Sequence, residues 1–371
     1  MNKKKLAIVM FSGGLDSLIA TRILQEQDID VIALIFKAPF INVDHIDEAI
    51  HLARELDIEY MVEDMGDEAL SMIINPRFGY GSGINPCRDC KILMLKKAKS
   101  IMESMTPMGA MCIATGDVVG QRPNSQLLHH LRVIDKESDL KGRLLRPLSA
   151  KLLDPTIPEI QGIINRNALY DIQGRSRKKI IELFHKYNFP NFPKLIKFPK
   201  NSAGCILTDK NFADKTRDHI SHNGSLSSTD FEILRIGRHI RINDNIKFVI
   251  GRNERENNIL ENIKLTDGSN EYTIVKPHNF LGPSVLIIDS NKSHNLNKSS
   301  KSNGSYKSNE LPSQAALDGS PEKVALPLPS IIQQAGSLMI RYTKKYDKDN
   351  IDNIQVLVIR QAHTSVERLI I

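Results

Sequence analysis

Short apolar runs and amphipathic stretches alternate along the first third of the chain. Residues 6–11, 31–36 and 111–114 are unbroken apolar runs of strand length. Apolar side chains recur at helical spacing after the first run and again over residues 47–56, and a short strand is expected near 59–62. Buried strands that alternate with helices are typical of a parallel sheet. The pattern therefore predicts the α/β class, with a doubly wound parallel sheet.

The pattern changes character from about residue 230. Apolar and basic residues alternate over 234–242, which is typical of a strand with one exposed face. Further strands are expected at 248–250, 272–277, 285–288 and 355–360, with a helix over 331–346. We therefore predict a first domain over residues 1–225 and a smaller α+β domain over 226–371. Residues 289–312 are rich in Ser, Asn and Lys and are predicted to be a flexible insertion.

The composition is that of a globular protein, with 371 residues of which 41% are apolar and 25% charged. The apolar stretch behind the basic N-terminus is too short for a signal peptide, and no run approaches the length of a membrane span. We therefore expect a cytoplasmic protein without a membrane partner. A net charge of +7 favours a polyanionic partner. Four cysteines in that setting suggest metal binding or thiol chemistry before disulfides.

A glycine turn follows the first apolar run directly and leads into the first predicted helix. It consists of Ser12, Gly13, Gly14, Leu15, Asp16 and Ser17. Glycines let the backbone turn tightly and present N–H groups to an anion, and the helix N-terminus adds donors. The two serine hydroxyls are further donors, and Asp16 suits a site that also holds a magnesium ion. The stretch predicts a phosphate-binding loop, with a plain helix-capping turn as the alternative.

The glycine spacing and the absence of a lysine exclude a Walker loop. The string SGGLDS resembles the PP-loop, SGGxDS, of the N-type ATP pyrophosphatases, whose domain is similar to the adenine nucleotide alpha hydrolases. That resemblance implies that ATP and Mg²⁺ bind here, that AMP is transferred to a substrate and that pyrophosphate is released. It also assigns nucleotide binding to the turn, with Asp16 catalytic as well. The residues concerned are Ser12, Gly13, Gly14, Asp16 and Ser17.

Polar residues follow two further predicted strands, and ligands of such sheets lie beyond the carboxyl ends of strands. Lys37 follows the second apolar run and is a candidate nucleotide-binding residue, with an ordinary strand exit as the alternative. A Thr-Gly-Asp string follows the run at 111–114, and it could also be a plain turn. Residues 114–126 and 144–148 resemble the ThiI family of tRNA 4-thiouridine synthases. On that resemblance four residues face the nucleotide or the target base: Thr115, Gly116, Asp117 and Gln121.

A CxxC pair stands at the start of a predicted helix. The helix dipole and the neighbouring Arg88 and Lys91 favour the thiolate forms of Cys87 and Cys90. Half of a structural zinc site is the alternative, but the chain offers no second CxxC or His pair of standard spacing. Cys112 lies inside an apolar run and is predicted to be a core residue.

The string GCILTD places a further cysteine, Cys205, late in the first half. It resembles the MnmA family of 2-thiouridylases, which, like ThiI, carries a second essential cysteine there. Two catalytic arrangements of Cys87, Cys90 and Cys205 follow from the resemblance. In the favoured one they bind a [4Fe-4S] cluster with one free iron. In the other, Cys205 carries a persulfide that Cys87 or Cys90 resolves as a disulfide.

Basic residues are densest over residues 174–200. Such a run is often only a solvated helix face, but it also suits contacts with RNA phosphates. Residues 230–365 resemble the NFACT-R RNA-binding module through the string GRNERENN and a later helix, with a generic β-rich or dimerisation domain as the alternative. The predicted RNA-binding residues are Arg175, Arg177, Lys178, Lys179, Arg238 and Arg241.

Together these resemblances imply a tRNA sulfurtransferase that adenylates a uridine carbonyl and replaces AMP with sulfur. The expected product is 4-thiouridine, with 2-thiouridine as the alternative. The THUMP and rhodanese domains of full-length ThiI are not found in the chain. We therefore expect the second half to capture tRNA and an external donor, a cysteine desulfurase or sulfide, to supply sulfur. A second copy of the chain, as a homodimer, is a further expected partner.

Two other functional classes stay open at this point. An adenylating enzyme that forms an amide or a nitrile would keep the PP-loop and have no need of three thiols. A non-catalytic RNA-binding protein would carry the loop as a relic and would tolerate the loss of Asp16.

Overall fold

The computed structural model describes residues 5–187, 189, 205–263, 271–290, 328–343, 355–360 and 365–370. The chain divides into two compact units, Met1–Arg217 and Asp218–Ile371. The boundary proposed between residues 225 and 226 stays a prediction. The predicted flexible insertion, from residue 291 onward, lies outside the described residues, as do residues 344–346 of the predicted C-terminal helix.

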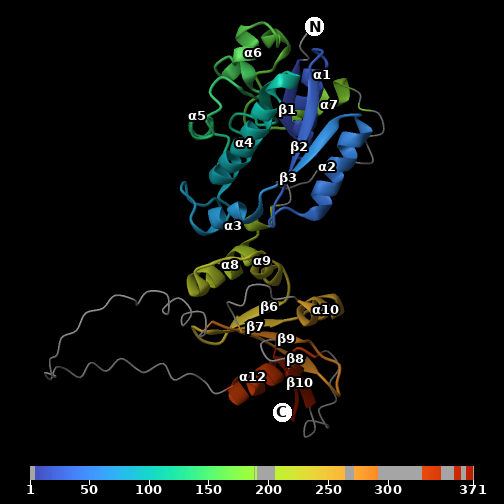
Figure 1. Cartoon of the computed structure of the whole chain (residues 1–371), viewed down its shortest axis with the longest axis vertical. Helices are drawn as coiled ribbons and strands as arrows, with labels where there is room; N and C mark the ends of the chain where they lie inside the picture. Colours follow the sequence, from blue (N-terminus) through green and yellow to red (C-terminus); the bar gives the residue numbers. More distant parts are fainter. Residues whose placement is uncertain are drawn as a thin grey trace, which may run out of the picture. The chain divides into compact units, whose positions relative to one another are not determined.

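The first unit contains a five-stranded sheet in the order β3-β2-β1-β4-β5 (Figure 1). All neighbouring strands run parallel; Met10 of β1, for example, pairs with Leu34 of β2 and with Thr115 of β4. Residues 6–10 are buried along their whole length, as expected for a strand covered on both faces. The strands are β1 Leu6–Met10, β2 Asp30–Lys37, β3 Glu59–Asp64, β4 Ala110–Thr115 and β5 Leu144–Leu145.

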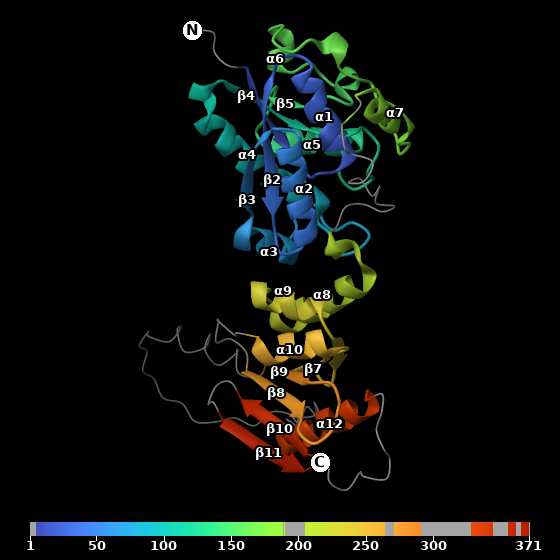
Figure 2. The same ribbon diagram turned by 90° about the vertical axis from the view of Figure 1, so that its right-hand side faces the viewer.

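Helices cover both faces of this sheet (Figure 2). Helices α1 (Leu15–Gln25), α2 (Val43–Glu55) and α7 (Lys178–Lys186) share one core with alternate strand residues. Helix α4 (Cys87–Ser104) packs against β1 and β4 from the other side. The predicted doubly wound α/β fold is thereby confirmed. The remaining helices of this unit are α3 Gly66–Ile74, α5 Leu128–Glu137 and α6 Ile157–Ile160.

The strand order places a topological switch point between β1 and β4. The chain leaves β1 towards β2 and β3, and later adds β4 on the opposite side of β1. Loops that leave the carboxyl ends of two such strands diverge and open a crevice for a ligand. The glycine turn follows β1 and the Thr-Gly-Asp string ends β4, so both motifs lie at this crevice.

The second unit contains a six-stranded antiparallel sheet in the order β11-β10-β8-β9-β7-β6. Helix α12 (Leu328–Arg341) covers one face, and α9 (Ser228–Arg235) and α10 (Glu254–Asn262) cover the other. The strands are β6 Arg238–Arg241, β7 Ile246–Ile250, β8 Glu271–Pro277, β9 Val285–Asp289, β10 Gln355–Arg360 and β11 Ser365–Ile370. Helix α8 (Lys210–Asn223) spans the division between the units. The prediction of an α+β second half is confirmed.

The strand predicted over residues 234–242 is wrong at its start. Leu234 and Arg235 end helix α9, and the strand begins only at Arg238. A capping box explains the helix, because Ser227 and Asp230 each bond the other's backbone N–H, at 2.9 and 3.1 Å. Gly237, with φ of 67°, then turns the chain into the strand.

Two further expectations concern burial. Cys112 is fully buried in the first core, as predicted. No helix among the described residues combines the length and the apolar character needed to cross a membrane.

Candidate functional site

The glycine turn is built by backbone and serine contacts at the start of α1. Gly13 has φ of 69°, and a Cβ there would lie 3.0 Å from the Ala49 Cα of α2. The Ser17 hydroxyl donates to the Gly14 carbonyl at 2.8 Å and accepts from the Ser12 N–H at 3.3 Å. Gly14 caps the helix without a side-chain bond. The local sequence thus forms the tight, donor-rich turn that an anion requires.

Gly116 brings the loop after β4 directly onto this turn. A Cβ at Gly116 would lie 2.5 Å from both the Asp16 carbonyl carbon and the Ser17 nitrogen. Only glycine fits such an approach, because real Cβ atoms do not come this close to backbone. The structure therefore brings together the turn and the Thr-Gly-Asp string, which the sequence separates by almost a hundred residues.

The Asp16 carboxyl lies between charged and polar neighbours from other loops. Its Oδ1 is buried without a hydrogen-bond partner, as is Oε1 of Gln121. Burial raises the pKa of Asp16 above its ordinary value, although Arg177, Arg122 and a hydrogen bond with Gln121 act in the opposite direction. Two oxygen acceptors that lack partners beside a phosphate-type loop suit a hard cation.

Asp117 sits in a buried network and is not an open ligand. It pairs with Lys91 of α4 at 3.0 Å and accepts hydrogen bonds from Thr115 at 2.9 Å and Gln126 at 2.8 Å. Burial alone would favour the neutral acid, but Lys91, Arg146 and Gln126 hold the pKa of Asp117 well below its usual range. The network fixes the helix that carries the CxxC pair against the end of β4.

Lys37, the other predicted nucleotide-binding residue, makes its contact elsewhere. Its ammonium forms a salt bridge of 3.2 Å with Asp64 on the neighbouring strand β3, and both side chains are more than half exposed. No structural contact links Lys37 to the glycine turn among the described residues, so its nucleotide role stays a prediction.

The cysteine segments are joined by the loop that precedes α4. The Asn85 side-chain amide donates to the Cys87 sulfur at 2.9 Å and accepts from the Gly83 N–H at 2.9 Å. The next N–H, of Ile84, donates to the Leu207 carbonyl at 3.0 Å. A Cβ on Gly83 would lie 2.2 Å from that same carbonyl oxygen. This loop thus holds the segment after Cys205 beside the start of α4.

Cys205 is also tied to the exit of β2. It forms an isolated antiparallel bridge with Ile41, and the Ile206 N–H donates to the Phe40 carbonyl at 3.2 Å. Because Phe40 follows β2 at the carboxyl edge of the sheet, the third thiol lies at the edge that bears the glycine turn.

The three thiols influence one another electrostatically. Burial raises the pKa of Cys90, and Cys205 and Cys87 raise it further. Burial and Cys87 also raise the pKa of Cys205, to about 11, against a lowering by the Leu207 N–H and by Arg122. The charge of Arg122 therefore lowers the pKa of both the Cys205 thiol and the Asp16 carboxyl. Sequence reasoning missed Arg122 and Asn85, although the first lies directly after the predicted Gln121. It named Lys91 only as a neighbour of the thiols, whereas Lys91 pairs with Asp117.

The thiols do not fit a shared metal as they lie. Among the described residues, no three His, Cys, Asp or Glu side chains are grouped closely enough to hold a metal ion. A [4Fe-4S] cluster with one free iron needs three cysteine ligands converging on it. The predicted ligation of a cluster by Cys87, Cys90 and Cys205 therefore does not fit this arrangement.

The predicted RNA-binding residues fall into different environments. Arg175 and Lys178 are exposed, and Lys179 lies 3.6 Å from Asp171. Arg177 caps α7 and faces Asp16. These residues are close together in the sequence, but their side chains lie in different environments.

Of the two predicted residues on β6, Arg238 stacks over the Tyr342 ring at 4.9 Å. Arg241 is held by both carboxylate oxygens of Asp218, at 3.1 and 2.8 Å, beside the buried Lys247. The guanidinium of Arg241 is therefore already engaged in a structural ion pair.

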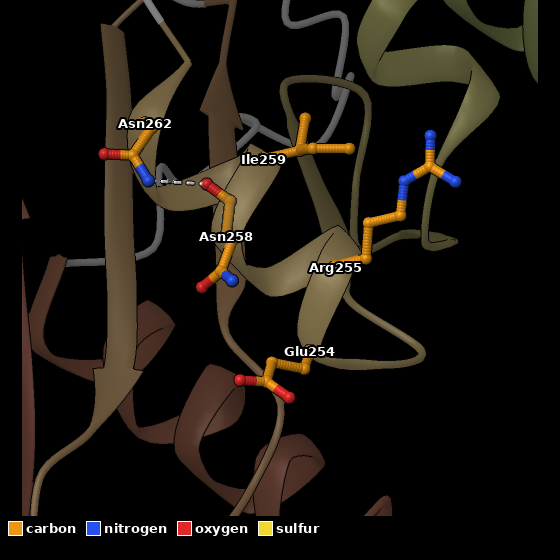
Figure 3. Close-up of a pocket in the computed structure, with 5 residues that line it drawn as sticks. All are labelled: Glu254, Arg255, Asn258, Ile259 and Asn262. Atoms are coloured by element: carbon orange, nitrogen blue, oxygen red, sulfur yellow. Dashed lines mark hydrogen bonds between the residues drawn. The ribbon is translucent and has the colours of Figure 1, made fainter.

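Helix α10 presents a polar hollow of about 660 Å³ in the second unit. Figure 3 shows that its lining residues come from successive turns of one helix, and the Asn262 amide donates to the Asn258 carbonyl at 2.8 Å. The hollow carries amide, guanidinium and carboxylate groups, and so it can form hydrogen bonds with a polar partner. Its lining is Glu254, Arg255, Asn258, Ile259 and Asn262.

Both halves match known protein families. Residues 5–157 match the tRNA methyl transferase HUP domain, and residues 237–318 match the NFACT protein RNA binding domain. Both matches agree with the resemblances found in SGGLDS and GRNERENN, so this recognition is confirmed. Below, the two parts are called the HUP domain and the NFACT module.

Several curated proteins that are similar to this part of the chain have the same name. The tRNA-specific 2-thiouridylase MnmA of Caldicellulosiruptor saccharolyticus is 28% identical over 256 residues, which are 62% of this chain and 64% of the relative. The enzyme of the same name from Listeria welshimeri is 23% identical over 246 residues, 62% of this chain and 60% of the relative. The chain thus spans less than two thirds of the length of these relatives.

Two solved structures are also similar. A 4-thiouridine synthetase in complex with RNA and bound ATP has a TM-score of 0.32 and 20% identity, covering 52% of each chain. A protein described as a predicted subunit of tRNA methyltransferase, from Methanocaldococcus jannaschii, has a TM-score of 0.27 and 18% identity. It covers 38% of this chain and 67% of that one. Neither likeness bears on the function.

Proposed function

We propose that this protein is an ATP-dependent tRNA sulfurtransferase that thiolates a uridine. One observation carries the proposal: a phosphate-type loop and three cysteines meet at one edge of a parallel sheet, with the charge of Arg122 acting on both Asp16 and Cys205. An enzyme that only adenylates its substrate has no need of thiols there. The similarity to MnmA enzymes over the HUP domain supports the same reaction class.

The first step is activation of the uridine. Its carbonyl oxygen attacks the α-phosphorus of ATP, the bond to the β-phosphate breaks and pyrophosphate leaves, so the base carries AMP as a leaving group. The protein's part is to position the phosphates and to neutralise their charge. The backbone N–H groups of Gly13 and Gly14 and the hydroxyls of Ser12 and Ser17 would do so.

The buried oxygens of Asp16 and Gln121 fit a magnesium ion. Magnesium takes one or two protein carboxylates and completes its shell with phosphate oxygens and water, so a larger acidic cluster is not required. Bound there, it would supply positive charge beside the phosphates. The partnerless Oδ1 of Asp16 is the atom that would contact it.

The second step transfers sulfur, and Cys205 would carry it as a persulfide. The terminal persulfide sulfur attacks the activated carbon, and AMP leaves. A thiolate then attacks the Cys205 sulfur, which releases the thiolated base and forms a disulfide. Two donors can then restore the persulfide. A dithiol reduces the disulfide and a cysteine desulfurase transfers sulfane sulfur from its own persulfide to Cys205, or sulfide attacks the disulfide directly, which forms the Cys205 persulfide and releases the Cys87 or Cys90 thiolate.

Cys87 is the better resolving thiol of the CxxC pair. The Asn85 amide donates a hydrogen bond to its sulfur, which stabilises negative charge there. Burial instead raises the pKa of Cys90 and disfavours its thiolate. Cys90 then serves the packing at the start of α4, where its thiol contacts the Met94 sulfur at 3.8 Å.

The NFACT module would capture the tRNA, together with the exposed Arg175 and Lys178 of the first unit. The name of the matching family and the net charge of +7 support an RNA partner. The polar hollow on α10 offers amide groups suited to a sugar or a base edge.

Mass spectrometry of nucleosides tests the proposal. Unmodified tRNA is incubated with the full chain, ATP, Mg²⁺, a cysteine desulfurase with its substrate cysteine, and a dithiol. We expect a thiolated uridine whose ring position, 4 or 2, is read from its fragmentation. Cys205→Ser and Cys87→Ser should abolish the product, while Cys112→Ala, which changes a core residue, should retain it.

Two outcomes contradict the proposal. If the cysteine variants keep full turnover of ATP into a non-sulfur product, the protein is a different adenylating enzyme. If Asp16→Ala leaves the cellular role intact in a complemented deletion strain, the loop has no catalytic function.

A further inference from the structure

We infer that Arg122 and Arg177 form a clamp that binds the β- and γ-phosphates of the nucleotide, the part that leaves as pyrophosphate. The inference rests on the proposed use of ATP. It assigns Arg177 to the nucleotide, whereas its place in a basic stretch had suggested RNA, and it gives a role to Arg122, which no motif had marked.

The two arginines come from different loops that the fold joins. Gln173 forms a parallel bridge with Val119, and the Gly174 N–H donates to the Val119 carbonyl at 2.7 Å. The segment that leads into α7 is therefore bonded to the loop after β4. Arg177 stands three residues beyond this bond, at the start of α7.

Arg122 is held on the other side by turns within its own loop. The Gln121 N–H donates to the Val118 carbonyl at 3.1 Å, and the Gln126 N–H donates to the Arg122 carbonyl at 2.8 Å. Gln121 also bonds Asp16 through its side chain, so its neighbour Arg122 is anchored beside the glycine turn. Since Gly116 packs on Asp16, the whole loop is pressed onto that turn.

Neither guanidinium forms a salt bridge within the described part of the chain, although both act on Asp16. Other arginines near the sheet edge are already engaged: Arg146, for example, binds Asp135 through two nitrogens. Asp117, the other nearby carboxylate, is neutralised by Lys91 at 3.0 Å. Two arginines around the single carboxylate of Asp16 leave an excess of positive charge over the turn.

A polyphosphate is the ligand that this excess charge fits. Guanidinium groups bind phosphate oxygens in a bidentate fork, and a pair of them spans adjacent phosphates. The Gly13 N–H and the Ser12 hydroxyl at the turn are donors suited to one phosphate group, while the Ser12 N–H and the Ser17 hydroxyl form bonds that hold the turn in shape. AMP carries too short a phosphate chain to reach both the turn and the clamp, so the site should discriminate strongly between ATP and AMP.

Binding measurements on the full chain test the clamp without requiring thiolation. Calorimetry with Mg²⁺ compares ATP, pyrophosphate and AMP, and a filter assay measures tRNA. Arg122→Ala and Arg177→Ala should each weaken ATP and pyrophosphate binding by about tenfold to a hundredfold, the range for a hydrogen-bonded charge. AMP and tRNA affinities should change by less than about twofold.

The matched control is Arg132→Ala, an exposed arginine on α5, which should leave all four affinities unchanged. Arg177→Lys and Arg122→Lys keep the charge but lose the fork, and an intermediate loss is expected. Circular dichroism melting of each variant separates lost contacts from lost folding.

The inference is overturned if pyrophosphate binds Arg177→Ala as well as the wild type, if tRNA affinity falls in parallel, or if the wild type binds no pyrophosphate. The inference of a clamp is supported if the clamp variants bind pyrophosphate more weakly than the wild type, even when no thiolated product is found. In that case the assignment of uridine thiolation fails and the clamp does not.

Discussion

Single side chains give the three thiols different surroundings. Asn85 supplies Cys87 with an N–H donor, while Cys90 and Cys205 lie where burial favours the neutral thiol. The spacing CxxC does not distinguish its two cysteines, because both lie in the first turn of the same helix. The difference comes from the Asn85 amide, two residues before Cys87, whose side chain folds back onto the Cys87 sulfur.

Asn85→Asp should slow alkylation of Cys87 by iodoacetamide about tenfold at neutral pH, since a carboxylate beside the sulfur disfavours the thiolate. The acceptor for the Gly83 N–H is retained, so the loop should keep its shape. Peptide mass spectrometry gives the rate, and ATP affinity should not change. An unchanged rate would show that the Asn85 amide does not stabilise the thiolate.

Alkylation of Cys205 should increase about tenfold per pH unit between pH 7 and 10, because only the thiolate reacts. Its pKa of about 11 lies above the ordinary thiol value, so the thiolate fraction still grows in this interval. Cys112, fully buried, should stay unmodified in the folded chain. If the alkylation rate instead reached a plateau near pH 8.5, Cys205 would not be buried from solvent in the way that the structure shows.

Among the secondary-structure elements, loops rather than strands assemble the site. The strands were predictable from apolar runs such as residues 6–11, and the helices from spacing of 3.6 residues. The strand predicted over 234–242 failed because the capping box at Ser227 and Asp230 outweighed an alternating pattern. Hydrogen bonds at a helix start form between neighbouring residues. The alternating pattern stabilises a strand only after that strand has packed in a sheet, so here the local bonds decide the structure.

Gly83→Ala should separate the two cysteine segments, because its Cβ would collide with the Leu207 carbonyl. Diamide oxidation should then give several-fold less of the Cys87–Cys205 disulfide, measured by peptide mapping, while ATP affinity is kept. Gly162→Ala is the control: its φ is 69° with nothing within 4 Å, so it costs about 1 kcal/mol of stability and leaves the disulfide yield unaffected. Equal disulfide yields in the two variants would contradict this role of Gly83.

The complete chain has a net positive charge and contains two domains of different topology. The net charge of +7 predicted a polyanionic partner but did not say which basic residues face it. In the structure Arg241 is bound to Asp218, Arg177 faces the glycine turn, and Arg175 is exposed. Arginines in similar sequence contexts therefore lie in different structural environments.

The salt dependence of tRNA binding distinguishes an arginine that contacts RNA from one that forms a structural ion pair. Arg175→Ala should reduce the slope of log affinity against log salt by about one, as expected for one lost phosphate contact. Arg241→Ala should leave the slope unchanged and instead lower the melting temperature of the NFACT module, because Asp218 loses the guanidinium that binds both of its oxygens and keeps only Lys247 from the neighbouring strand. A reduced slope for Arg241→Ala would return it to the RNA interface.

From its sequence alone this protein could be assigned a parallel sheet, a phosphate-type loop, a CxxC pair at a helix start and a second, α+β half. Each of these depends on residues close together in the chain, whose spacing sets the local backbone and the buried face. The positions of Arg122, Arg177, Asn85 and Cys205 were decided only by the tertiary structure. They converge through the parallel order β2-β1-β4 and through glycine contacts such as Gly116 on Asp16, which join segments tens of residues apart. Packing between distant segments leaves no periodic trace in the sequence, and the electrostatics of the site depends on that packing.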